Sequence, residues 1–155
     1  MAERTQRTAS HLPIFVGTLL LAGIAGFVLF RAQRLPTGPE AVAWDRAVCA
    51  HCHMHVGDPH YAAQLQTSDG DVLNFDDPGC LFLYVQSRHP TVHATYYHDA
   101  HTERWWRRDE AGFVPAAHTP MGYGLAATSR GTAGAVSADE AARRVVGGAQ
   151  ARPSP

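Results

Sequence analysis

Residues 61–90 read YAAQLQTSDGDVLNFDDPGCLFLYVQSRHP, and this stretch decides the fold. It opens with two short runs rich in apolar residues, Tyr61–Thr67 and Val72–Phe75. The dipeptide Asp69-Gly70 between them is typical of a tight turn that joins antiparallel strands. We therefore predict a β-hairpin here.

A helix is predicted directly after the hairpin. Asp77 is a favourable N-cap, and Pro78 suits the first helical position because its missing N–H would have no helical partner there. His89-Pro90 should end the helix, since a proline disfavours helical geometry in the residue before it. The apolar side of this helix would be formed by Leu81, Leu83, Tyr84 and Val85.

The following residues repeat a similar order of elements. Further strands are predicted at Val92–His98, Arg104–Trp106, Phe113–Ala117 and Gly122–Thr128. The segment Ser137-Ala-Asp-Glu140 is a capping box that should open a helix to Val146, and Gly147-Gly148 is expected to end that helix. We predict an α+β fold with two related halves, the second without its last strand.

Composition restricts the class of protein. The chain has 155 residues, 45% of them hydrophobic, and a formal net charge of −1, which fits one small globular unit. The arginines are not clustered enough to follow a phosphate backbone, so nucleic acid is not an expected partner. Three cysteines are too few for a disulfide-stapled miniprotein. The catalytic motifs of common hydrolases and phosphate-binding enzymes are not seen, so an enzyme is not expected.

The N-terminal region predicts a membrane anchor. Residues 12–30 (LPIFVGTLLLAGIAGFVLF) carry no charge, and as a helix they would rise about 28 Å, enough to cross the hydrocarbon core. We favour an uncleaved single-pass anchor over a cleaved signal peptide because no small-x-small cleavage site follows the run. Arginines flank both ends, so the charge pattern barely orients the segment.

These observations divide the chain into five parts. They are an N-terminal flank (1–11), a transmembrane anchor (12–30), a tether containing prolines and a glycine (31–43), a globular domain (44–147) and a disordered tail (148–155).

The densest chemical pattern is residues 49–55, CAHCHMH. In an extended segment side chains alternate, so Cys52 and Met54 would project to one side of it. The other side would carry three imidazoles, those of His51, His53 and His55. The same segment can therefore offer a sulfur face or an imidazole face to a metal ion.

Two methionines other than Met1 favour a soft metal. Met54 and Met121 stand outside obvious apolar stripes, and thioethers are good ligands for Cu(I) but poor ones for Zn²⁺ or Mg²⁺. If the fold brings the two loops together, Cys52, Met54 and Met121 would form a Cu(I) site. Met121 packed beneath a turn is an equally reasonable interpretation.

Other interpretations of the cysteines remain open. Cys49-x-x-Cys52 is compatible with a thiol-disulfide oxidoreductase or with a disulfide in an oxidising compartment, which would close the soft site. The two thiols with two histidines are also compatible with a structural Zn²⁺ site. Cys80, beside Leu81 and Phe82, is expected to be a small buried hydrophobe.

The order of motifs resembles the NosL family, the nitrous oxide reductase accessory proteins. The resemblance spans about residues 45–146. It rests on Cys49-x-x-Cys52-x-Met54, Tyr61-Ala-Ala-Gln64, Asp69-Gly70, Phe75-Asp-Asp-Pro-Gly-Cys80, Tyr97-His-Asp99 and Thr119-Pro-Met-Gly122.

The resemblance implies a fold of two ββαβ-like halves and a Cu(I)-binding metallochaperone. By motif position its ligands would be Cys52, Met54 and Met121. The expected partners are a copper donor and a client copper enzyme, such as nitrous oxide reductase or a terminal oxidase. The domain would lie on the extracytoplasmic, periplasmic side of the cell membrane. This chain has His53 where family members commonly have glycine, and a membrane helix where many have a lipid anchor.

Overall fold

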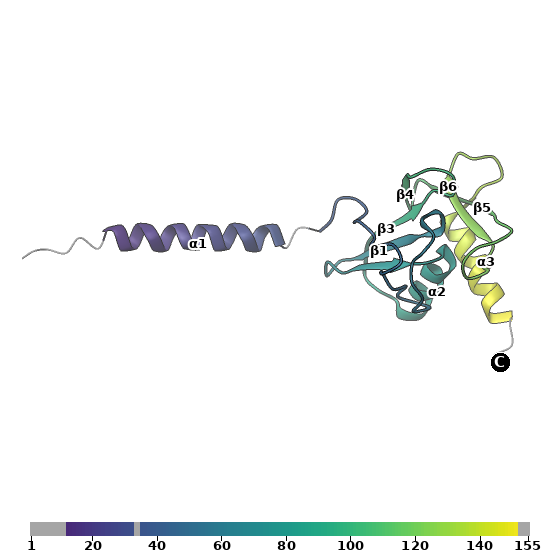
Figure 1. Ribbon diagram of the computed structural model, residues 1–155, viewed down its shortest axis with the longest axis horizontal. Helices are drawn as coiled ribbons and strands as arrows, with labels where there is room; N and C mark the ends of the chain where they lie inside the picture. Colours follow the sequence, from purple (N-terminus) through teal and green to yellow (C-terminus); the bar gives the residue numbers. More distant parts are fainter. Residues whose placement is uncertain (1–11, 33–34, 152–155) are drawn as a thin grey trace, which may run out of the picture. The chain divides into compact units, whose positions relative to one another are not determined.

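The computed structural model describes residues 12–32 and 35–151 of the chain (Figure 1). It divides into two units, one formed by the N-terminal helix and one that begins at Leu35. The predicted flank (1–11) and residues 152–155 of the predicted tail lie outside the described residues.

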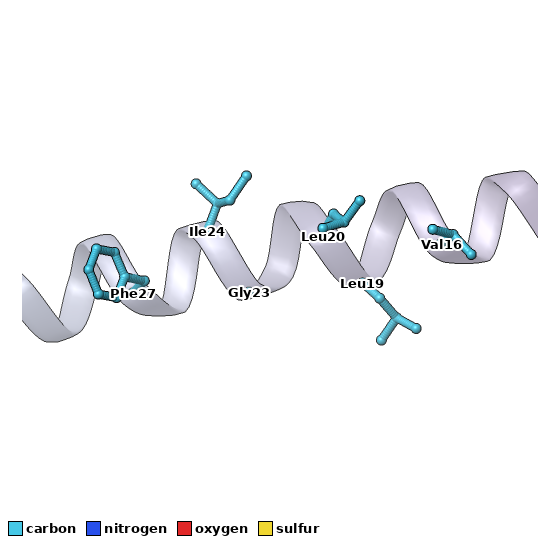
Figure 2. A pocket seen from close by; sticks show the side chains of 6 residues that line it. All are labelled: Val16, Leu19, Leu20, Gly23, Ile24 and Phe27. Carbon is cyan, nitrogen blue, oxygen red and sulfur yellow. The ribbon is translucent and has the colours of Figure 1, made fainter.

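The N-terminal unit is the helix α1, Leu12–Ala32. Its apolar side chains project outward from the helix, as Figure 2 shows for Val16, Leu20 and Phe27, and Leu19 is 73% exposed. Among the described residues, no helix is both long enough and apolar enough to meet the requirements of a membrane span. The predicted helix is thus present, and its role as an anchor stays a prediction.

The first sheet contains the predicted hairpin. It consists of β1 (Ala63–Thr67), β2 (Val72–Phe75), β3 (Val92–His98) and β4 (Trp105–Arg107), in the antiparallel order β2-β1-β3-β4. The helix α2, Pro78–Arg88, joins β2 to β3 and is capped by the predicted residue Asp77, whose carboxylate accepts a hydrogen bond from Gly79 N–H at 2.8 Å. The run β1-β2-α2-β3 is the predicted ββαβ unit.

The second sheet is smaller. It consists of β5 (Ala111–Pro115), β6 (Leu125–Ser129) and the two-residue strand β7 (Val136–Ser137), in the order β6-β5-β7, and helix α3 follows at Ala138–Ala151. The prediction missed β7. This strand pairs antiparallel with β5, as β3 pairs with β1, but it precedes the helix of its half. Within the described residues, no strand follows α3.

The predicted end of the last helix is wrong. Helix α3 continues through Gly147 and Gly148 to Ala151, so residues 148–151 of the predicted tail are helical. A glycine ends a helix when it adopts the left-handed conformation, and neither of these glycines has a positive φ. The buried side of α3, formed by Ala138, Ala141 and Val145, packs into the common core.

The segment before the domain lies against the first sheet. The buried amide of Gln64 bonds to both backbone groups of Glu40, accepting from its N–H at 2.8 Å and donating to its carbonyl at 3.1 Å. Gln66 donates to the carbonyl of Gly38 at 2.7 Å. Part of the predicted tether (31–43) therefore supplies hydrogen-bond partners to two buried glutamines of β1.

One apolar core joins the two sheets. The ring of Phe113 on β5 packs edge-to-face against Tyr97 on β3 and Phe82 on α2, at centroid distances of 4.9 and 5.4 Å. Cys49, Leu65 and Phe75 belong to the same buried cluster. The loop that carries the cysteine motif is therefore built into the core.

A glycine fixes the start of α2 against the loop that contains Met121. A Cβ on Gly79 would lie 2.3 Å from the ring of Tyr123, so Gly79→Ala should force that loop outward and lower the free energy of unfolding by about 1–3 kcal/mol. The matched control is Gly147→Ala in α3, where a Cβ meets nothing within 4 Å and better helix propensity should add up to about 1 kcal/mol. Chemical denaturation of both variants checks this, and equal stability of the two would contradict it.

Candidate metal centre

The cysteine motif forms a short closed loop. Val48 and His55 form an isolated antiparallel bridge, and inside it Cys49 N–H donates to the Met54 carbonyl at 2.8 Å. His53 N–H donates to the Cys49 carbonyl at 3.0 Å, which closes a tight turn around Cys52. His53 has a φ of 63°, the left-handed region that glycine adopts most easily. This turn folds the two thiols of the motif toward each other.

Two hydrogen bonds donated by backbone N–H groups fix the loop to the first half of the fold. Ala50 N–H donates to the carbonyl of Asn74 on β2 at 2.9 Å. Gly57 N–H donates to the carboxylate of Asp76 at 3.3 Å, directly before α2. These contacts place the loop beside the first turn of α2.

Three sulfur atoms meet at this place. The Sγ atoms of Cys49, Cys52 and Cys80 all lie within 4.8 Å of one another, and we call these residues the thiol cluster. Cys49 and Cys80 are fully buried, whereas Cys52 is partly exposed. Cys80 is the third residue of α2, so it lies in the first turn of that helix. The cluster can hold a metal ion.

The three cysteines of the thiol cluster differ in pKa. The Cys80 thiol donates to Cys49, and together with the N–H groups of Cys52, Asp76 and His51 this outweighs burial and lowers the pKa of Cys49 to about 4. The same hydrogen bond raises the pKa of Cys80, and burial raises the pKa of Cys52. Near pH 7 the cluster therefore contains one thiolate and two thiols.

Two carboxylates add negative charge. Burial raises the pKa of Asp76 and of Asp77, and the nearby Cys49 thiolate raises both further. Among residues 35–151, no cationic side chain forms an ion pair with either carboxylate. A cation bound at the thiol cluster would relieve this repulsion.

The three predicted ligands lie in different surroundings. Cys52 belongs to the thiol cluster. Met54 follows it in the loop and is 58% exposed. Met121 is half-buried against the core, and its N–H donates to the Asp77 carboxylate at 3.2 Å. Asp77 caps the helix that carries Cys80, so the loop that contains Met121 lies against the N-terminus of α2. The predicted joint site of Cys52, Met54 and Met121 stays a prediction.

Sequence reasoning missed the contribution of Cys80. The expectation of a buried hydrophobe was right about its burial, but its sulfur faces two other thiols. The available signal was its position in the first turn of a helix with a clear N-cap, a place where reactive cysteines are often found. The histidines His51, His53 and His55 are not part of the cluster.

Comparisons with family models, with curated proteins and with solved structures gave no match to this chain.

Proposed function

We propose that the protein is a membrane-anchored Cu(I) metallochaperone whose cargo is held by the thiol cluster. The observation that carries the proposal is the convergence of three sulfur atoms, from two separate segments, within 4.8 Å of one another. Thiolates are soft ligands that select Cu(I), Zn²⁺ and iron–sulfur clusters over hard cations.

The size of the ligand set favours Cu(I) over a structural Zn²⁺ ion. Structural zinc sites are almost always closed by four protein ligands. In the described part of the chain, the group of candidate ligands contains three cysteines and no fourth histidine, cysteine or carboxylate. Cu(I) accepts fewer ligands, so three sulfurs suit it.

The exposure of the sulfurs fits transfer of a cargo. Cys49 and Cys80 are fully buried, so Cys52 is the member of the cluster that an outside ligand can reach. Met54, two residues further along and exposed, supplies a neutral thioether beside it. We propose that copper enters and leaves by ligand exchange on the Cys52 side. The sequence-based prediction that Met54 and Met121 complete the site with Cys52 is the alternative to this ligand set.

The resemblance to the NosL family supports the same function. The position where that family commonly has glycine is occupied by His53, and its φ of 63° explains why glycine suits it. By this resemblance α1 would anchor the domain on the extracytoplasmic side of the membrane. A copper donor and a copper enzyme, such as nitrous oxide reductase, would be the partners.

Proton release tests the ligand set. At pH 7 Cys49 is already ionised while Cys52 and Cys80 keep their protons, so binding through three thiolates should release two protons. Cu(I) affinity should then rise about 100-fold per pH unit near neutrality and fall as the solution becomes acidic. Competition with a coloured Cu(I) chelator across this pH range measures the slope.

The methionines provide the control for this titration. A site made of Cys52, Met54 and Met121 would release one proton, which corresponds to about tenfold per pH unit. The double variant Met54→Leu, Met121→Leu should keep the slope of two protons. A slope of one in the unmodified chain, with binding lost in the double variant, would contradict the thiol cluster as the ligand set.

A further inference from the structure

The thiol cluster also has the geometry of a redox-sensitive site. A disulfide needs two cysteines whose sulfurs can approach to about 2 Å after small side-chain rotations. Cys49 and Cys52 are joined by the tight turn that the bond from His53 N–H to the Cys49 carbonyl closes, and their sulfurs lie within 4.8 Å. The distance alone does not select a pair, because Cys80 lies within the same limit.

Solvent exposure determines which cysteine is oxidised first. An external disulfide must be attacked by a sulfur that it can reach, and Cys52 is the partly exposed member of the cluster. Cys49 and Cys80 are both 0% exposed, so neither can form the first mixed disulfide without opening of the core.

The tight turn selects the second cysteine. Cys49 lies three residues before Cys52, in the turn that the bond from His53 N–H to the Cys49 carbonyl closes, so one short loop carries both sulfurs. Cys80 belongs instead to the first turn of α2, which Asp77 caps. Cys49 is therefore the residue placed to attack the Cys52 sulfur.

We propose that reversible formation of a Cys49–Cys52 disulfide, with Cys80 left as a free thiol, switches the metal site off. First the Cys52 sulfur attacks an external disulfide, its S–S bond breaks, and one half leaves as a thiol with the Cys52 proton. Cys49 then attacks the Cys52 sulfur, forming the internal disulfide and expelling the second half as a thiolate. Two electrons pass from the cysteine pair to the external disulfide, which a low-molecular-weight or protein disulfide supplies.

The disulfide would remove two of the three sulfur ligands of the proposed site and leave Cys80 as its single thiol. This loss of ligands disfavours a bound cation. The loss of metal binding rests on the proposed function, whereas the disulfide itself does not.

Disulfide mapping of the metal-free full-length chain tests the switch. The reduced protein is incubated with oxidised glutathione without oxygen, then denatured, alkylated and analysed by peptide mass spectrometry. We expect a Cys49–Cys52 disulfide and an alkylated Cys80. A disulfide that includes Cys80, or three alkylated cysteines, would overturn the proposal.

Two variants test the order of attack. In Cys49→Ala the reaction should stop at a glutathione mixed disulfide on Cys52. Cys52→Ala, at the partly exposed position, should leave Cys49 and Cys80 unmodified in the folded protein. Efficient closure of a Cys52–Cys80 disulfide in the first variant, or glutathione on Cys49 in the second, would contradict the assigned roles. Circular dichroism confirms that each variant is folded.

The effect on the cargo is measured with Cu(I) itself. Chelator competition should give an affinity at least about 100-fold weaker for the oxidised chain, since loss of outer partners alone costs 10–100-fold, and reduction should restore it. Equal affinities of the oxidised and reduced chains would refute the switch. Failure of the reduced chain to bind Cu(I) would refute the proposed function, while the disulfide map stands as a separate result.

Discussion

Replacing Cys80 with alanine is expected to weaken Cu(I) binding at least about 100-fold, because a directly bound sulfur is lost and loss of outer partners alone already costs 10–100-fold. Cys80 is 0% exposed, so a change at the protein surface cannot explain this loss of affinity. The variant also removes the proton donor to Cys49, so the pKa of Cys49 should rise. Competition with a coloured chelator at pH 7 measures the change in affinity.

Met121→Leu is the matched control for this variant. The backbone N–H groups of both residues donate to Asp77, Met121 to its carboxylate and Cys80 to its carbonyl, and leucine conserves most of the volume of methionine. The variant should keep the affinity of the unmodified chain within a few-fold. Unchanged Cu(I) binding in Cys80→Ala together with lost binding in Met121→Leu would show that the methionines, and not Cys80, are ligands.

The second large effect is expected in the core. Phe113 is fully buried and packs against Tyr97 and Phe82, so it joins the two sheets. Phe113→Ala should lower the free energy of unfolding by about 3–5 kcal/mol, because it removes buried apolar surface and leaves a cavity. Denaturant unfolding of the full-length chain measures this change.

Cooperativity is part of the same prediction. If the sheets share one core, the variant should still unfold in a single transition, with both halves losing structure together. The exposed control Val92→Ala, at a residue that is 41% exposed, should change stability by less than about 0.5 kcal/mol. Two separate transitions, or a loss below 1 kcal/mol in Phe113→Ala, would contradict a common core.

The parts of the fold that the sequence predicted depend on short-range signals. Asp69-Gly70 specifies the hairpin turn, and Asp77-Pro78 specifies where α2 begins, whatever the rest of the chain does. The strand β3 was also predicted with its observed bounds. The α+β class followed from these elements.

The errors of the prediction occur where contacts between residues far apart in the sequence determine the secondary structure. The strand β7 has two residues, too few to form a periodic pattern, and it exists because β5 offers an unpaired edge. Helix α3 continues through Gly147 and Gly148 although glycine weakens a helix interior by about 1 kcal/mol, so the local signal was overruled.

The candidate site shows the same division. Cys52 was selected from the local motif, and the thiol cluster contains it. Cys80 was missed because a cysteine beside Leu81 and Phe82 in a helix has the local pattern of a core residue. Only the turn around Cys52 and the position of α2 bring its sulfur to the other two, and neither is visible in a local pattern.

X-ray absorption at the copper edge of the Cu(I)-loaded, reduced full-length chain tests the central claim most directly. The account predicts a first coordination shell made of sulfur alone, with three scatterers in the unmodified chain and fewer in Cys80→Ala. A shell dominated by nitrogen or oxygen, or a sulfur shell that Cys80→Ala leaves unchanged, would contradict it.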